Sequence, residues 1–435
     1  MSPRGLRKVN ASSRPGRRGG VRLSRSGTFR LVVAHPSVSA DILLPCSRAM
    51  SQDSFARFGT LAVHAGQAPE PTTGAIMPPI FQTSTYVQPA IAEPLGGIYD
   101  YARVANPTRE ALERNLAALE AGSHGIAFAS GLAAIESVLK CLSAGDHVVS
   151  EENTYGGTTR MFTRVLSRLG LEFTFVDTRD PEAVAAAMRS NTRLVHVETP
   201  TNPMMRLCDI ARVAEIAHGG GARLMVDNTF ASPFNQRPLE LGADIAVHST
   251  TKYLNGHSDI IGGVVVVRDD ALAEEIRFVR KSTGAVPGPM DAWLCLRGTK
   301  TLHLRMAAHN ANGMAVARFL EAHARVDRVF YPGLPSHEQH ELASRQMSGY
   351  TGMVSMDVGT LDRARAVVEH TRVFQLAESL GGVESLISVP SLMTHASVPQ
   401  EMRERMGVTD GLVRLSVGIE DVEDLVADLD RALGG

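Results

Sequence analysis

Short apolar runs alternate with longer amphipathic segments through the middle of the chain. Runs such as 194–197 and 224–226 are almost continuously apolar, as in strands that are buried on both faces. Strands and helices in alternation predict a mostly parallel sheet that is covered by helices on both faces. The pattern predicts strands at 125–129, 146–150, 171–176, 193–198, 222–226, 241–246 and 261–267, and helices at 109–121, 131–142, 157–169, 181–189, 209–217 and 291–323.

The pattern changes beyond Val326. Strand-like runs at 350–358, 386–389 and 412–418 are joined by helical segments at 361–370 and 421–433. This mixture predicts a second, smaller α+β domain at the C-terminus. We therefore divide the folded chain into a large domain over 110–305 and a C-terminal domain over 306–435.

The first 109 residues differ from the rest. Residues 1–49 are rich in arginine, serine and glycine and hold one acidic residue, Asp41, which predicts a disordered tail. A nucleic-acid arm and an organelle transit peptide are alternatives, but we favour an inert tail, or a true start at Met50. Residues 50–109 are irregular and rich in proline, which predicts an arm that lies on a neighbouring subunit.

Composition excludes several classes of protein. The net charge of −2 gives no field that would attract nucleic acid or a membrane, and no long apolar run predicts a membrane span. The four cysteines lie far apart and form no zinc-binding pattern. The chain is therefore expected to be a cytoplasmic protein with reduced thiols and no metal site.

A single lysine among hydroxyl side chains follows the apolar strand that ends near Val247, in the string HSTTKY (248–253). A lysine at the end of a buried strand should have a lowered pKa, and a neutral amine forms a Schiff base with an aldehyde. On a strand, Ser249 and Thr251 would share one face and both could bind one phosphate. Lys252 is therefore a candidate catalytic residue.

Polar groups follow other predicted strands, at the sheet edge where α/β proteins bind ligands. The backbone N–H groups of Gly131 and Leu132 would face an anion, and the ring of Tyr155 could stack on a flat cofactor, although a packed tyrosine is the alternative. Asn202 lies in a proline-rich turn. Asp227 ends an apolar strand and needs a partner, such as a protonated pyridine nitrogen.

Two arginines add anion-binding groups. Tyr101 and Arg103 can reach one anion together, although a solvated arginine is the alternative. Arg414 lies in the middle of an apolar strand, where it should meet a carboxylate of the protein or of a ligand. The set as a whole contains the parts of a pyridoxal phosphate site.

Nearly all of residues 55–435 resembles the pyridoxal-phosphate enzymes of cysteine and methionine metabolism, the group of cystathionine γ-lyase, cystathionine γ-synthase and methionine γ-lyase. The matching strings, in order, are YARVANPTR (101–109), ASGLAA (129–134), TYGGTTR (154–160), ETPTNP (198–203), VDNTF (226–230), HSTTKY (248–253), AESLGGVESL (377–386), MTHAS (393–397) and RLSVGIED (414–421).

The resemblance implies the aspartate-aminotransferase type fold (fold type I) and pyridoxal 5'-phosphate as cofactor. It implies that Lys252 forms the Schiff base and then acts as base, that Asp227 pairs with the pyridine nitrogen, and that Tyr155 stacks on the cofactor and moves a proton. It assigns the cofactor phosphate to Gly131, Leu132, Ser249 and Thr251, with Tyr101 and Arg103 from a neighbouring subunit of a homotetramer. It assigns the substrate carboxylate to Arg414, with Asn202 and Ser379 nearby, and it also counts Asn202 among the cofactor-binding residues.

Two departures help to choose the member of the group. Gly157 stands where methionine γ-lyases carry a cysteine, and Glu378 stands where they carry a residue that is not acidic. Glu378 and Arg160 could instead bind the distal ammonium and carboxylate of cystathionine. We therefore expect a cystathionine γ-lyase, which releases cysteine, 2-oxobutanoate and ammonia.

Other activities stay open. Cystathionine γ-synthase, which joins cysteine to O-succinyl- or O-acetylhomoserine, is the main alternative, followed by O-acetylhomoserine sulfhydrylase and methionine γ-lyase. A plain aminotransferase would share the fold but does not suit YARVANPTR or TYGGTTR. A non-enzymatic protein is disfavoured because no catalytic position is altered.

Overall fold

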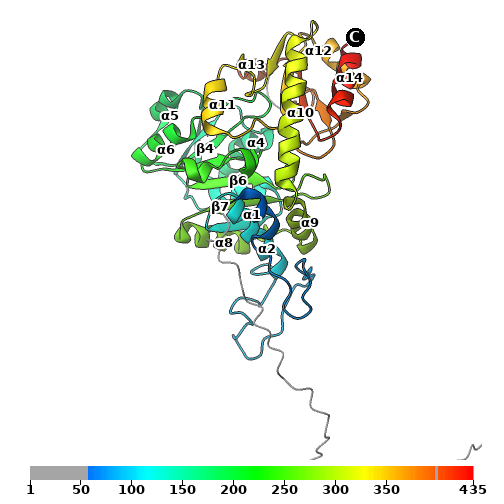
Figure 1. Cartoon of the computed structure of the whole chain (residues 1–435). Helices are drawn as coiled ribbons and strands as arrows, with labels where there is room; N and C mark the ends of the chain where they lie inside the picture. The colour runs from blue at the N-terminus through cyan, green and yellow to red at the C-terminus, as the bar shows by residue number, and fades with distance from the viewer. Residues whose placement is uncertain (1–56, 397–399, 435) are drawn as a thin grey trace, which may run out of the picture. The chain divides into compact units, whose positions relative to one another are not determined.

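The computed structural model describes residues 57–396 and 400–434 of the chain, and these belong to one compact unit. The predictions for residues 1–49 and for the first seven residues of the arm fall outside the described residues. The predicted boundary between residues 305 and 306 lies inside one continuous helix, α10, which runs from Leu302 to Ala322 (Figure 1).

The larger sheet has seven strands, in the order β1-β7-β6-β5-β4-β2-β3. Strands β2 to β6 pair in parallel, and β7 runs antiparallel to both of its neighbours. The sheet is therefore mostly parallel, as the sequence pattern predicts. Its strands are β1 His124–Phe128, β2 His147–Glu151, β3 Glu172–Val176, β4 Thr192–Glu198, β5 Arg223–Asp227, β6 Ile245–Ser249 and β7 Gly263–Val267.

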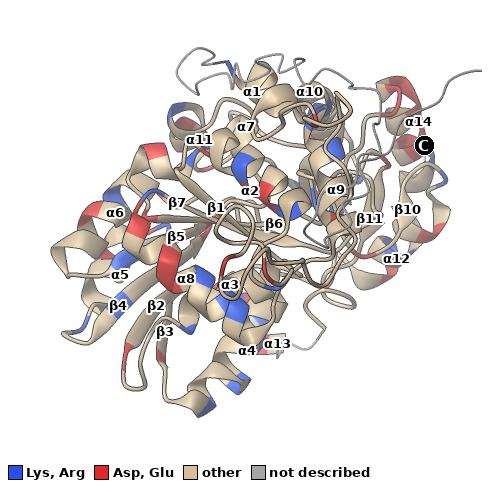
Figure 2. Cartoon of the chain, turned by 90° about the horizontal axis from the view of Figure 1, so that it is seen from below, with Lys and Arg blue, Asp and Glu red and all other residues tan. Residues whose placement is uncertain are grey.

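Apolar side chains cover both faces of this sheet. On β7, Val264 and Val266 pack into one hydrophobic cluster and Val265 and Val267 into another, because side chains alternate across a strand. Figure 2 shows α3, α4 and α8 on one side of the strands and α1, α2, α7 and α9 on the other. The helices of this region are α1 Phe58–His64, α2 Pro107–Leu119, α3 Gly131–Leu139, α4 Gly156–Arg164, α5 Pro181–Ala187, α6 Ile210–Gly219, α7 Ser232–Asn235, α8 Asp270–Thr283 and α9 Pro289–Thr299.

The smaller sheet has five strands in the order β10-β11-β12-β9-β8, and all of its pairs except β10–β11 are antiparallel. This is the α+β architecture that the C-terminal pattern predicts. Helix α10 contributes Met306 to a core under the large sheet and Leu320 to the core of the small sheet, so it joins the two. The elements are β8 Arg328–Phe330, α11 His340–Gln346, β9 Met353–Asp357, α12 Leu361–His370, β10 Gln375–Leu376, β11 Leu386–Ser388, α13 Gln400–Arg405, β12 Leu412–Ser416 and α14 Val422–Leu433.

The prediction of one long helix over 291–323 is wrong, because α9 ends at Thr299 and α10 begins at Leu302. The buried guanidinium of Arg305 donates to the carbonyl oxygen of Gly298 at 2.9 Å and to that of Tyr253 at 2.7 Å. The Gly298 carbonyl near the end of α9 thus accepts from a side chain as well as from the backbone N–H of Thr301. The same arginine holds the turn that follows β6.

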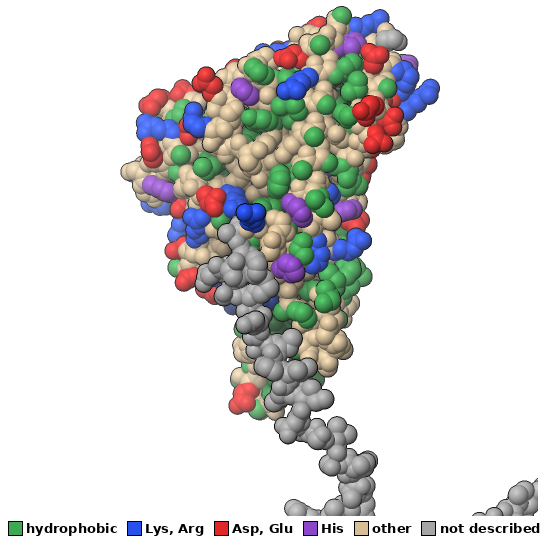
Figure 3. Space-filling view, viewed as in Figure 1, with side chains coloured by type: hydrophobic (Ala, Val, Ile, Leu, Met, Phe, Trp, Pro, Cys, Tyr) green, Lys and Arg blue, Asp and Glu red, His purple; other side chains and the backbone are tan. Residues whose placement is uncertain are grey.

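Within the predicted arm, residues 66–106 contain no helix and expose many large apolar side chains. Ile91 is 98% exposed, Val87 is 85% exposed and Ile76 is 77% exposed. Figure 3 shows hydrophobic side chains at the surface of the lower end of the molecule, where the arm lies in Figure 1. A segment that exposes this many apolar side chains is typical of a surface that is buried against another chain.

No helix in the described ranges has the length and apolarity that a membrane crossing requires. Three cysteines, Cys141, Cys208 and Cys295, are free thiols, whereas Cys46 lies outside the described residues. The cytoplasmic location stays a prediction.

Candidate active site

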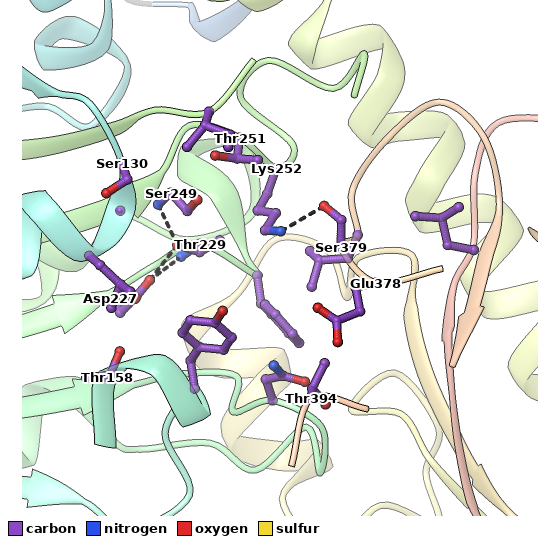
Figure 4. A pocket seen from close by; sticks show the side chains of 18 of the residues that line it. Ser130, Thr158, Asp227, Thr229, Ser249, Thr251, Lys252, Glu378, Ser379 and Thr394 are labelled. Carbon is purple, nitrogen blue, oxygen red and sulfur yellow. Dashed lines mark hydrogen bonds between the residues drawn. The ribbon is translucent and has the colours of Figure 1, made fainter. Parts of the chain in front are cut away.

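A cavity of about 730 Å³ opens at the carboxyl ends of the parallel strands and is closed on one side by residues of the smaller sheet (Figure 4). This placement follows the general rule for ligands of parallel sheets. The cavity brings together most of the side chains that the sequence singles out. Its wall includes Gly131, Leu132, Tyr155, Asn202, Asp227, Ser249, Thr251, Lys252, Glu378, Ser379 and Arg414.

Lys252 lies in the turn after β6, and its Nζ donates a hydrogen bond to Ser379 Oγ at 2.8 Å (Figure 4). Burial lowers the pKa of Lys252 to about 8, and the positive charge of Arg414 acts in the same direction. A large fraction of this amine is therefore neutral near pH 8, as a nucleophile or base requires. The lowered pKa agrees with the expectation from the sequence.

The arrangement of Ser249 and Thr251 differs from the expectation that both lie on one strand. Strand β6 ends at Ser249, because the backbone N–H of Lys252 turns back to the carbonyl of Ser249 at 3.3 Å. The Thr251 hydroxyl instead bonds the backbone of Gly262, across the turn. Both side chains still line the cavity.

Asp227 ends β5 and lies in the cavity wall. Its Oδ1 accepts hydrogen bonds from the Thr229 N–H at 3.0 Å and from the Thr229 hydroxyl at 2.5 Å. The Thr229 hydroxyl also accepts from the N–H of Ser249, so it ties the ends of β5 and β6 together. Burial raises the pKa of Asp227 above its usual range, against the opposing effects of Thr229 and His248. A cationic ring nitrogen would satisfy such a carboxylate.

The start of α3 forms a cradle for an anion. Ser130 caps this helix by accepting from the N–H of Ala133 at 3.1 Å, and Gly131 and Leu132 are its first two residues. Their N–H groups have no acceptor within the helix. A Cβ atom on Gly131 would lie 2.9 Å from the Cβ of Ser249, so only glycine allows this close approach. The cradle fits the phosphate of pyridoxal phosphate.

Arg414 is 2% exposed and is held in a fixed orientation. It donates to Asn202 Oδ1 and to the carbonyl oxygen of Ser379, each at 2.9 Å, and its Nε has no hydrogen-bond partner among the described residues. Burial lowers the pKa of Arg414 to about 10, which leaves the guanidinium charged at neutral pH. Ser379 has a φ of +85° and directs its carbonyl to Arg414 and its hydroxyl to Lys252. The result is a fixed cation that could bind a carboxylate.

Tyr155 directly precedes α4 and is 44% exposed within the cavity wall. A Cβ atom on Gly157 would lie 2.4 Å from Cε1 of the Tyr155 ring. A side chain at position 157 would therefore require the Tyr155 ring to move from the position that it has here. This contact gives Gly157 a structural role beyond its use in distinguishing members of the group.

We expect Gly157→Ala to displace the Tyr155 ring, and therefore to lower kcat by about tenfold or more through misplacement of a reacting group. Steady-state kinetics and the visible circular dichroism of the bound cofactor would measure the effect. Gly219→Ala, at the end of α6 where a Cβ atom meets nothing within 4 Å, is the control. Wild-type kinetics and an unchanged dichroism signal in Gly157→Ala would contradict the role of this glycine.

Sequence reasoning missed Glu198, which ends β4 next to Asp227 on the neighbouring strand. Its carboxylate accepts from the backbone N–H of Tyr155 at 2.8 Å and from that of Asn202 at 3.0 Å. Burial and the nearby carboxylate of Asp227 raise the pKa of Glu198 well above its usual range. The available signal was the same as for Asp227, a carboxylate at the end of an apolar strand.

Three predicted residues do not line the cavity of their own chain. Tyr101 and Arg103 lie in the exposed arm, where the Arg103 guanidinium is 5.3 Å from the Tyr101 ring centre and donates to the carbonyl of Lys281. Arg160 is exposed on α4. Their assignments to the cofactor phosphate and to the distal part of the substrate stay predictions.

The sequence model described as "Cys/Met metabolism PLP-dependent enzyme" matches residues 59–434. The chain belongs to this family. It is therefore an enzyme of sulfur amino-acid metabolism, and its cofactor is pyridoxal 5'-phosphate. The anion cradle at α3, the carboxylate of Asp227 and the lowered pKa of Lys252 fit this cofactor.

Relatives of this family member carry three different activities in their names. Cystathionine gamma-lyase of Dictyostelium discoideum is 51% identical, over 88% of this chain and 99% of that protein. Cystathionine beta-lyase of Lactococcus lactis subsp. cremoris is 50% identical, over 86% of this chain and 98% of that protein. Cystathionine gamma-synthase of Mycobacterium bovis (strain ATCC BAA-935 / AF2122/97) is 51% identical, over 88% of this chain and 100% of that protein.

A solved structure confirms the fold of the family. The crystal structure of cystathionine gamma-lyase from Lactobacillus plantarum, complexed with L-serine, superposes with a TM-score of 0.84 at 45% sequence identity, over 86% of this chain and 98% of that one. The predicted fold type I architecture is thus confirmed. Chemistry on cystathionine is common to the names of these relatives, which do not agree on the bond that is broken or formed.

Proposed function

We propose that this enzyme is a cystathionine γ-lyase. The observation that best supports cystathionine as the substrate is the acidic side chain of Glu378, which lies in the same cavity wall as Lys252 (Figure 4) and Arg414. The Glu378 carboxylate raises the pKa values of both Lys252 and Arg414, although burial outweighs it at each. A cavity with a fixed cation and a separate carboxylate suits a substrate with a carboxylate at one end and an ammonium group at the other, as in cystathionine.

The residues of the chain supply binding and proton transfer. Arg414, held by Asn202 and Ser379, orients the substrate α-carboxylate. The amine of Lys252, partly neutral near pH 8, removes the proton from the substrate Cα. Tyr155, which lines the cavity, is our candidate proton donor to the departing sulfur. When bound, the cofactor supplies an electron sink for the carbanion. Loss of a second proton, from Cβ, breaks the Cγ–S bond, and the departing sulfur takes up a proton and leaves as cysteine. Addition of water to the remaining four-carbon fragment then yields 2-oxobutanoate and ammonia.

We expect Glu378→Gln to raise the KM for L-cystathionine by about tenfold, since an ion pair with a distal ammonium is lost while the side chain keeps its size. The value of kcat should change little, because Glu378 contacts a part of the substrate that does not react. Glu384→Gln, which changes another glutamate of the same wall, is the matched control and should have a smaller effect. An unchanged KM in Glu378→Gln would remove the support that this residue gives to cystathionine.

The deciding experiment gives the purified holoenzyme L-cystathionine alone. Fast release of cysteine and 2-oxobutanoate supports the γ-lyase. Homocysteine and pyruvate would assign the activity of the β-lyase relatives instead. If the enzyme turns over little cystathionine but forms it rapidly from cysteine and O-succinylhomoserine, it is a γ-synthase. The relative from Mycobacterium bovis favours this alternative.

We also propose that the arm of one subunit completes the cavity of a neighbour in a homotetramer. The exposed apolar side chains of the arm and the position of Tyr101 and Arg103 outside their own cavity support this arrangement. Arg103→Ala and Lys252→Ala should each be nearly inactive. Mixed and reassembled, they should regain up to about a quarter of wild-type activity, because some shared sites then carry both wild-type residues. No recovery, with subunit exchange demonstrated, would contradict the shared site.

A further inference from the structure

A buried pair of ionisable side chains lies behind the cavity, outside the set of residues assigned above. Glu120 immediately follows α2, and His248 lies on β6, and both side chains are 1% exposed. The Nε2 of His248 bonds Oε1 of Glu120, which also accepts from Nδ2 of Asn228 at 2.8 Å. Glu120 Oε2 and His248 Nδ1 have no hydrogen-bond partner among the described residues.

The position of Glu120 calls for a positive partner. A carboxylate at the C-terminal end of a helix lies in the unfavourable part of the helix dipole. Burial disfavours its charge further unless a cation pairs with it. His248 is the ionisable group in direct contact, and its Nε2 bonds the carboxylate.

The same carboxylate holds the two strand ends that carry the cofactor site. Asn228 directly follows Asp227, the last residue of β5, and His248 precedes Ser249, the last residue of β6. Because side chains alternate across a strand, Asp227 and Ser249 face the cavity while Asn228 and His248 face Glu120. The backbone N–H of Asn228 donates to the carbonyl of Val247 at 2.9 Å, and this hydrogen bond joins the ends of β5 and β6.

We propose that Glu120 and His248 form a buried hydrogen-bonded pair behind the cofactor cavity, which positions Asp227 for the pyridine nitrogen. The proposal rests on the assigned role of Asp227 as the partner of the pyridine nitrogen. The electrostatic effect agrees with the geometry, since the charge of His248 lowers the pKa of Asp227 while burial raises it. Both are positioning residues, because neither lines the cavity.

The test compares His248→Gln with His196→Gln. His196 is an equally buried histidine on β4 of the same sheet, but its ring bonds the hydroxyl of Ser150 at 3.1 Å, and burial lowers its pKa to about 3. We expect His248→Gln to weaken the binding of pyridoxal phosphate to the apoenzyme by about tenfold, because loss of a group that orients a binding residue typically costs this much. It should lower kcat by a similar factor and leave KM nearly unchanged.

Equilibrium dialysis of the apoenzyme measures cofactor affinity independently of turnover, and thermal melts check that the variants fold. Glu120→Gln should act in the same direction, and the double variant should be no worse than the poorer single one. Equal cofactor affinity in His248→Gln, His196→Gln and wild type would overturn the proposal, provided that Asp227→Asn binds cofactor weakly. If Asp227→Asn also binds normally, the assigned role of Asp227 fails instead.

Discussion

Lys252→Met is expected to lower kcat by about 10⁴-fold, the upper range for loss of a general base. The variant removes the amine, while the anion cradle at α3 and the carboxylate of Asp227 stay in place to hold the cofactor. Methionine has nearly the length of lysine, so the packing of the turn after β6 should persist. Turnover of L-cystathionine by the cofactor-loaded variant is the measurement, and full activity would contradict the assignment of Lys252.

The same substitution should stabilise the apoenzyme at pH 7. The pKa of Lys252 is about 8 in the folded protein and 10.5 in its ordinary state, so folding below pH 8 requires burial of a charged amine. Between pH 8 and pH 10.5, Lys252 is protonated in the unfolded chain and neutral in the folded protein. The free energy of unfolding of the wild type therefore rises with pH in this range. The advantage of Lys252→Met should therefore shrink as the pH approaches 10.5.

Thermal melts of the apoenzyme at pH 7 and pH 10 measure this difference. Lys300→Met is the matched control, because Lys300 is another partly buried lysine, lies outside the cavity and donates to the carbonyl of Val63 at 2.8 Å. The Lys300→Met variant should keep full activity. A melting temperature of apo Lys252→Met below that of the wild type at pH 7 would contradict the electrostatic argument.

Arg414→Leu should lower kcat/KM by about 10²-fold to 10³-fold, as expected when one partner of a buried charged contact is removed. Most of the loss should fall on KM, since the carboxylate is held in the ground state as well as in the transition state. Arg414→Lys should recover only part of the loss, because an ammonium group lacks the planar fork that holds both Asn202 and Ser379.

A pair of ligands makes the test of Arg414 specific. The wild type should bind an amino acid far more tightly than the amine that lacks the α-carboxylate, as followed by the visible absorption of the bound cofactor. Arg414→Leu should bind the two about equally. If the variant still prefers the amino acid, another group binds the carboxylate.

The sequence by itself determined the parallel sheet and most of the cavity wall. Asp227, Ser249 and Lys252 could be placed together because each follows an apolar strand, and the carboxyl ends of parallel strands share one edge. Arg414 was found for a similar reason, since a guanidinium in an apolar strand must have a partner. The family motifs added the cofactor and the fold type, both of which the comparisons confirm.

Tertiary structure decided which distant groups meet. Arg305 bonds the Gly298 carbonyl near the end of α9, and Glu198 joins the backbones of Tyr155 and Asn202. Glu120 meets His248 across 128 positions of the chain. The packing of elements likewise decides that Tyr101, Arg103 and Arg160 lie outside the cavity of their own chain. Hydrophobic periodicity reports which side of an element is buried, whereas the partner of a buried polar group depends on how elements pack and cross, which no local pattern records.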